Sequence, residues 1–187
     1  MKYLISGWID LKKYSYKDEE LPYEFQLILQ GTKDGFSRTM FEQKCYNIEQ
    51  TLIMIKIKET GELVGGYNPV CWNEKEKSPN EHYYIETDKS FIFKIDENQP
   101  DNSILSRIKD PKGAIYHYGQ VINFTRNHVK FHEITIDFNV LALCISVNNE
   151  PYCYYRDNSS YYENNLNLSK KVHLLEECEV YKMVKKN

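Results

Sequence analysis

The sequence is poor in the features that mark several large classes of protein. It contains 8 glycines and 6 prolines in 187 residues, and its formal net charge is −3. So little glycine and proline argues against a collagen-like or low-complexity chain. A charge this close to zero argues against nucleic-acid binding, which depends on a basic surface. The cluster of Lys182, Lys185 and Lys186 is short enough to be ordinary solvated surface. We therefore expect no nucleic-acid partner.

Long apolar runs and closely paired cysteines are also missing. No stretch approaches the roughly 18 apolar residues of a membrane helix, and the apolar run that follows Met1 is too short for a secretion signal. The 5 cysteines are scattered and form no CxxC pair. This pattern favours a reducing compartment. We expect a cytoplasmic protein without a transmembrane segment.

What the sequence has in abundance is apolar and aromatic side chains. Hydrophobic residues make up 41% of the chain and aromatic residues 14%, with 16 tyrosines. This composition is too apolar for a disordered chain, and the length suits one domain with a core of its own. Aromatic side chains pack well on a pleated surface, so the composition favours β-sheet.

Period-two alternation of apolar residues predicts several strands. Tyr23–Gln30 alternates as a half-buried strand does. Thr51–Lys58 begins apolar on both faces, which is typical of a central strand, and a tight turn leads to a return strand, Leu63–Tyr67. Gly65 and Gly66 imply close backbone approach or a bulge there. The other expected strands are Ser90–Ile95, Ala114–Tyr118, Val121–Phe124, Ile134–Phe138, Leu141–Val147, Glu150–Tyr155 and Cys178–Val184, and the expected loops are Asn73–Glu81 and Arg156–Lys171.

Helical signals are fewer. Residues 4–21 predict a short helix and a charged linker, because Pro22 ends any helix before it. Gly31–Gly35 is expected to be a turn, after which Ser37 can cap a helix that buries Phe41 and Cys45. Together these elements predict an α+β, mostly β protein, namely a two-sheet antiparallel β-sandwich with one or two flanking helices.

The histidines offer one candidate metal site. His128 and His132 are four residues apart, with Glu133 adjacent. On a helix both imidazoles would face one way. The segment around them is predicted to be extended or loop, a third ligand is not evident, and the glutamate of the HExxH motif is missing. We favour solvated or singly hydrogen-bonded histidines and expect neither a metal nor a cofactor.

The cysteines offer candidate nucleophiles. Cys45, Cys144, Cys153 and Cys178 fall in elements that are expected to be buried, where cysteine behaves as a small hydrophobic residue. Cys71 lies beside a loop and is the one that we expect to be exposed and oxidisable. An inert thiol is favoured at each position, and no catalytic residue is assigned.

Two other sets of residues have simpler structural explanations. Three glycines match no phosphate-binding motif, so a hairpin explains them better. Carboxylates in the loop before Ser90 keep ordinary acidity, and those that flank the strand are expected to cap a turn rather than to contact a partner. The glycines are Gly61, Gly65 and Gly66, and the carboxylates are Glu74, Glu76, Glu81, Glu86 and Asp88.

Tyrosines concentrate near the end of the chain, at Tyr152, Tyr154, Tyr155, Tyr161 and Tyr162. Tyrosine is enriched at protein interfaces, because it joins a large apolar face to a hydrogen-bonding tip. A β-rich fold also favours tyrosine for packing. Packing is the favoured reading, and the interaction surface is left unassigned.

Four ordered blocks of the first hundred residues resemble the TLDc domain family. They are Gly31–Ser37 with Phe41 and Cys45, Thr51–Lys56, Gly65–Pro69 with Trp72, and Thr87–Phe93. The resemblance runs from about Leu21 to Met183. Two departures stand out: Gln50 replaces the usual proline, and Gly119 alone stands where the family has a glycine-rich block. Trp8–Asp10 also resembles the lead-in of fungal or amoeboid proteins in which TLDc follows a BTB domain.

The resemblance implies a β-sandwich with flanking helices that acts without catalysis. It divides the chain into a lead-in, residues 1–21, and a TLDc-like domain, residues 22–184. It also implies resistance to oxidative stress and binding or regulation of the proton-pumping V-ATPase. One alternative is a diverged adaptor, related to BTB–TLDc proteins, that binds a different protein. A second alternative is a hydrolase or a peroxide-consuming enzyme.

Overall fold

The computed structural model describes residues 1–12, 16–17, 21–73, 81–117, 124–126, 129–139, 141–146, 150–156 and 160–186, with the backbone alone for 124–126, 129–135 and 144–146. Its helices are α1 (Lys2–Ile9), α2 (Gly31–Asp34) and α3 (Arg38–Cys45), with short 3-10 helices η2 (Pro100–Asn102) and η3 (Pro111–Gly113). Its strands are β1 (Tyr23–Gln30), β2 (Thr51–Ile57), β3 (Leu63–Asn68), β4 (Tyr83–Ile85), β5 (Phe91–Ile95), β6 (Ile104–Arg107), β7 (Ile115–His117), β8 (Phe124–Arg126), β9 (Val129–Asp137), β10 (Leu141–Ser146), β11 (Pro151–Tyr155) and β12 (Val172–Lys185).

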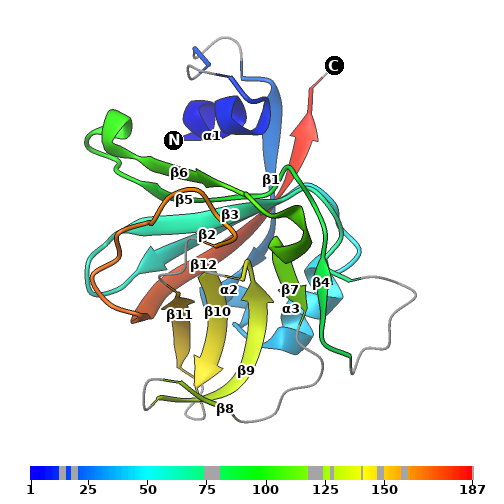
Figure 1. Cartoon of the computed structure of the whole chain (residues 1–187), viewed down its shortest axis with the longest axis vertical. Helices are drawn as coiled ribbons and strands as arrows, with labels where there is room; N and C mark the ends of the chain where they lie inside the picture. The colour runs from blue at the N-terminus through cyan, green and yellow to red at the C-terminus, as the bar shows by residue number, and fades with distance from the viewer. Residues whose placement is uncertain are drawn as a thin grey trace.

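One long strand, β12, joins the two parts of the main sheet. Ten of the described strands form an antiparallel sheet in the order β6-β5-β3-β2-β12-β11-β10-β9-β8, with β1 added on β12. The start of β12, Val172–Leu174, pairs with β11, whereas its later part pairs with β2 and β1. The pairing with β2 shifts register between Leu175 and Glu177, where the two parts meet. Strands β9–β11 therefore cross the strands of the other part (Figure 1).

The main core lies between the two parts of this sheet. Ile53 of β2 and Val180 of β12 pack in one buried cluster with Ile136 of β9. Gly66 lets β3 approach the opposite layer, because a Cβ atom there would lie 2.6 Å from the ring of Phe138. The expected mostly-β sandwich with few helices is confirmed. A small second sheet, formed by β4 and β7, completes it.

Strand β2 is buried on both faces, as its apolar start predicts. Ile53 and Ile55 point into the main core, whereas Leu52 and Met54 point into a second core on the other face of the sheet. Its pairing with β3 runs without a shift through Gly65 and Gly66. Close packing, rather than a bulge, therefore explains these two glycines.

The second core is covered by helix α1. Trp8 packs against Phe91 and Phe93 of β5, with ring centroids 6.1 and 5.8 Å apart. The carboxylate of Asp10, just after the helix, accepts hydrogen bonds from Tyr16 (2.6 Å) and Tyr23 (2.7 Å). The expected N-terminal helix is present and lies on the sheet. The boundary between residues 1–21 and 22–184 stays a prediction.

The helix after the first strand follows its prediction, and the turn before it does not. Ser37 caps α3 by accepting a hydrogen bond from the amide of Met40 (3.3 Å), and Phe41 and Cys45 are buried. Gly31–Gly35 was expected to be a turn, but Gly31–Asp34 forms the short helix α2. Gly35 ends that helix with a φ of 96°, a backbone angle that glycine adopts easily.

Most predicted strands form within a few residues of their expected limits, with three differences. Strands β4 and β6 were not predicted, because three or four residues are too short to show alternation. The strands expected at Ile134–Phe138 and Cys178–Val184 are longer and begin at Val129 and Val172. Of the strand expected at Val121–Phe124, residues 121–123 lie outside the described part, and β8 begins at Phe124.

No helix among the described residues is long and apolar enough to cross a membrane.

Candidate functional site

The buried thiols have the surroundings of packing residues. Cys45, Cys153 and Cys178 are free and fully buried. Burial raises the pKa of the Cys45 thiol to about 12, and it raises the pKa values of Cys153 and Cys178 as well. These thiols stay protonated at neutral pH, which removes the reactive thiolate. Cys71 is half-buried and lines a surface groove, and the side chain of Cys144 lies outside the described part.

One of the two histidines considered as metal ligands, His132, lies in a strand. His132 and Glu133 belong to strand β9, which confirms the expected extended conformation, and His128 lies outside the described residues. Within the described part of the chain, no three His, Cys, Asp or Glu side chains are placed to hold a metal ion.

The remaining candidates have the structural roles expected for them, with one change. Gly61 turns the β2–β3 hairpin with a φ of 70°. Glu86 and Asp88 are exposed, but the turn between them is capped by Thr87, whose hydroxyl accepts from the amide of Lys89 (3.3 Å). Glu81 is exposed at the start of the segment that leads to β4. Glu74 and Glu76 lie outside the described residues.

A two-stranded ribbon, β4 with β7, separates its residues into an inner and an outer face. Ile85 and Ile115 are paired across the ribbon and belong to the main core. His117, also on the inner face, is buried and stacks on Tyr83, with ring centroids 4.5 Å apart and an interplanar angle of 16°. The ribbon is thus attached to the main core at one end by Ile85 and Ile115, and its other end carries the stacked rings of Tyr83 and His117.

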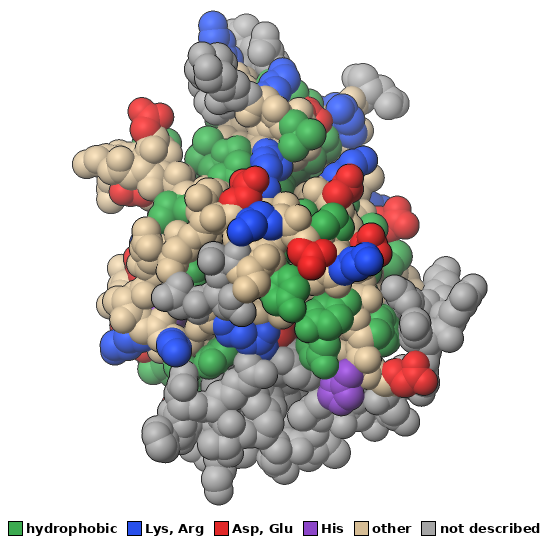
Figure 2. Space-filling view, in the orientation of Figure 1, with side chains coloured by type: hydrophobic (Ala, Val, Ile, Leu, Met, Phe, Trp, Pro, Cys, Tyr) green, Lys and Arg blue, Asp and Glu red, His purple; other side chains and the backbone are tan. Residues whose placement is uncertain are grey.

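The outer side carries four aromatic rings in a line, which we call the aromatic row: His82, Tyr116, Tyr84 and Tyr161. Successive ring centroids in that order lie 6.2, 4.7 and 6.4 Å apart. Tyr84, the cross-strand partner of Tyr116, is 45% exposed. Hydrophobic side chains gather over β4 and β7 beside a histidine in Figure 2. Exposed tyrosines on a firm support are the residues that protein interfaces favour.

The support of the row comes from the loop before β7. Gly113 lies under Tyr161, and a Cβ atom at that glycine would come within 1.9 Å of the tyrosine ring. The carbonyl of Gly113 also accepts a hydrogen bond from the side chain of Asn139 (2.8 Å). Tyr161 is therefore seated directly on backbone, which fixes one end of the aromatic row.

The tyrosines singled out from the sequence divide between core and surface. Tyr162 is buried and donates to the carbonyl of Ala114 (2.9 Å), and Tyr155 is buried and donates to Asn165 (2.9 Å). Tyr152 and Tyr154 are half-buried. Tyr161 alone of the five joins the aromatic row. Tyr84 and Tyr116 were missed, although two aromatic-rich runs, His82–Tyr84 and Tyr116–Tyr118, are visible in the sequence.

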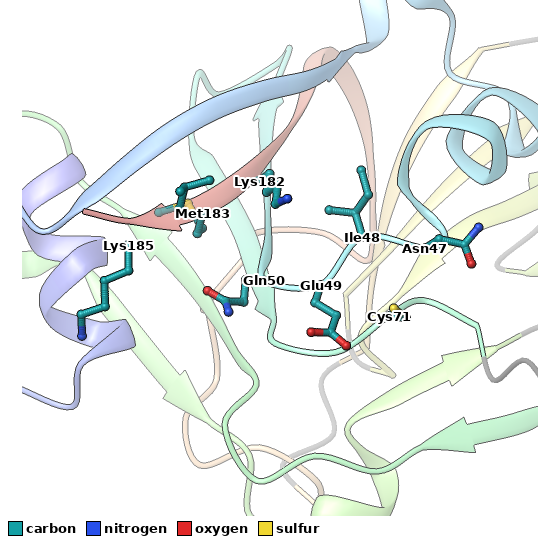
Figure 3. A pocket seen from close by; sticks show the side chains of 9 residues that line it. Asn47, Ile48, Glu49, Gln50, Cys71, Lys182, Met183 and Lys185 are labelled. Atoms are coloured by element: carbon teal, nitrogen blue, oxygen red, sulfur yellow. The ribbon is translucent and has the colours of Figure 1, made fainter. Parts of the chain in front are cut away.

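A second surface feature is an open groove beside the end of β12. Its volume is about 540 Å³, and its walls are the segment Asn47–Gln50, Cys71 and the residues Lys182–Lys185. Figure 3 shows Glu49 on one wall and Lys182 on the other. Lys185 lies toward α1, where it pairs with Asp10 (3.3 Å). Charges of opposite sign line the groove, so it offers no field that would select an ionic ligand.

Comparison with protein-family models relates the chain to a known family. The TLDc domain family model matches residues 9–184, from the last residue of α1 almost to the end of β12. A search of curated proteins found no match.

Proposed function

Because this chain belongs to the TLDc domain family, we propose that it works as a protein-binding module and not as an enzyme. The observation that carries the proposal is the aromatic row, which presents the exposed rings of His82 and Tyr84 beside the half-buried rings of Tyr116 and Tyr161. The protonated, buried thiols support the non-catalytic part of the proposal, since such groups are poor nucleophiles.

The proposed partner is the V-ATPase, as the resemblance to the family implies. Binding would favour one assembly state of that pump, because a protein that binds one state more tightly shifts the equilibrium toward it. Resistance to oxidative stress would follow from this regulation in the cell. Both statements rest on the family relationship, whereas the place of contact rests on the geometry of the ribbon.

A binding experiment with the isolated pump tests the proposal. Replacement of both central rings of the row, Tyr84→Ala with Tyr116→Ala, should weaken binding at least about tenfold, since each exposed interface tyrosine contributes roughly 1–2 kcal/mol. The matched control is Leu27→Ala, because Leu27 is 48% exposed on β1, away from the ribbon. Unchanged affinity in the double variant would exclude the row as the contact surface. Absence of binding by the wild type would exclude this partner.

One observation favours the alternative of an adaptor with a different partner. Gln50, where the family usually has proline, adopts a φ of 55°, and its amide donates to the carbonyl of Pro69 (3.2 Å). Proline has no amide hydrogen to donate and cannot reach a positive φ. The backbone just before β2 therefore differs from the family pattern. Proximity labelling in cells separates the two ideas: recovery of pump subunits alone would count against the adaptor.

A further inference from the structure

His117 is a buried residue that can gain a proton, although an uncharged aromatic ring would fill the same space. Its side chain is 6% exposed and lies between Tyr83 and Tyr46, whose ring centroids are 4.5 and 5.8 Å away. Its Nε2 atom has no hydrogen-bond partner among the described residues, and the ring also bonds to the Trp72 backbone. The imidazole therefore connects the ribbon to α3 and to the segment after β3.

The two ends of the ribbon are held differently. At the end near η3, the amide of Thr87 donates to the carbonyl of Pro111 (3.2 Å), and the carbonyl of Ala114 accepts from Tyr162 (2.9 Å). Neither bond involves a group that gains or loses a proton near neutral pH, so this end of the ribbon should stay attached as the pH falls. At the other end, the ring of His117 makes the contacts with Tyr46 and the Trp72 backbone, and Tyr83 packs beside it against the main core. We propose that protonation of His117 releases this end of the ribbon from α3.

The charges around the imidazole favour its neutral form. Arg38 on α3 repels a positive charge on the imidazole, and Glu42 on α3 attracts it more weakly. His82, just before β4, adds a smaller repulsion. Burial is the largest effect and, with Arg38, lowers the pKa of His117 below its ordinary value despite the bond to Trp72. Tyr83 stacks on the imidazole, so cation–π attraction to its ring face offsets part of the cost. It does not supply an acceptor for the Nε2–H that protonation creates.

The sign of the pH dependence follows from this lowered pKa. In the released state the imidazole is solvated, with the ordinary pKa of about 6.5. A group whose pKa is lowered in the closed state favours closure above pH 6.5 and loses that contribution as the pH falls. At pH 5.5 the equilibrium constant for opening of the ribbon should therefore be up to about ten times its value at neutral pH.

Hydrogen exchange of the wild-type chain measures this opening without any partner. Protection factors correct for the intrinsic exchange rate. For amides of β4 and β7 they should decrease by a factor of up to about ten between pH 7.5 and pH 5.5. Amides of β2 and β3 should keep their protection. Equal loosening of all four strands, or unchanged protection of the ribbon, would overturn the proposal while leaving the proposed partner untouched.

Two variants and one titration complete the test. His117→Phe keeps a planar ring and takes no proton, so the pH dependence of the ribbon should disappear. His82→Gln removes an exposed imidazole just before β4. Its repulsion of His117 is weaker than that of Arg38, so most of the wild-type pH dependence should remain. If the phenylalanine variant retains the dependence, His117 is not its source. Should that variant fail to fold, the NMR titration of His117 in the wild type decides, since a pKa at or above 6.5 excludes the mechanism.

Discussion

The backbone conformation of Gln50 explains why this position does not hold a proline. It precedes β2 with a φ of 55°, donates its amide to Pro69 and accepts from the amide of Met183 (2.8 Å) through its carbonyl. A left-handed conformation costs a non-glycine residue roughly 1–2 kcal/mol. The two hydrogen bonds to neighbouring elements offset this cost, so the position selects against proline and tolerates glycine.

We expect Gln50→Pro to destabilise the protein by about 3 kcal/mol or more, because proline removes the amide donor and cannot reach a positive φ. Gln50→Gly is the matched control and should leave stability unchanged or raise it slightly, since glycine adopts this angle without strain. Urea unfolding followed by tryptophan fluorescence gives both values. A proline variant as stable as the wild type would show that the entry into β2 can rearrange.

At the scale of elements, α1 contributes to the fold as a packed layer. Its Trp8 and Ile5 fill the second core against β5, and the carbonyl of Trp8 accepts from Arg107 on β6 (2.8 Å). The helix thus covers apolar side chains on the outer face of the sheet. Its loss would expose that face to water.

Trp8→Ala should lower the free energy of unfolding by about 3–5 kcal/mol, the usual effect of emptying a large aromatic site in a core. The control is Leu11→Ala, since Leu11 is 68% exposed just after the helix and surface changes usually stay within about 0.5 kcal/mol. Denaturation curves of the two variants provide the comparison. Equal stability of both would mean that α1 is only loosely attached.

The elements also show what could be predicted from the sequence. The β2–β3 hairpin was predictable, because Thr51–Tyr67 carries both its alternation and its turn locally. The aromatic row was not, because it combines rings from β4, from β7 and from Tyr161, and only the pairing of distant segments aligns them. His117 was equally invisible, since its burial depends on contacts with α3 that no local pattern encodes.

At the scale of the whole molecule, ionised carboxylates tie distant parts of the chain together. Burial alone would raise the pKa of Glu177, but bonds from Thr32, from the amide of Cys178 and from Gln30 outweigh it and lower the pKa. Hydrogen bonds from Tyr16, Tyr23 and Lys185 lower the pKa of Asp10 against the same effect of burial. A carboxyl whose pKa is lowered by folding stabilises the native state above its unfolded pKa and loses that contribution in acid.

Protonation of His117 already lowers stability below about pH 6.5, and a further and steeper fall is expected below about pH 5, as these carboxylates take up protons. Glu177→Gln should lose about 1–2 kcal/mol at pH 7, because it weakens bonds to a charged acceptor, and less at pH 3.5. Glu176→Gln is the control, since Glu176 is 50% exposed and its ion pair is with the exposed Lys56. Parallel pH curves for the wild type and the Glu177 variant would contradict this assignment.

The position of β12 in the chain has a consequence for biosynthesis. The strands that pair with β12 are synthesised before it; they are β1, β2 and β11. Tyr23 in β1, for example, cannot pair until Lys185 has been synthesised. Until then the nascent polypeptide presents two unjoined sheet fragments with bare edges, a state prone to aggregation. We expect the sheet to close only after β12 has been synthesised, and folding to be slow for a domain of this size, because these pairings join distant parts of the chain.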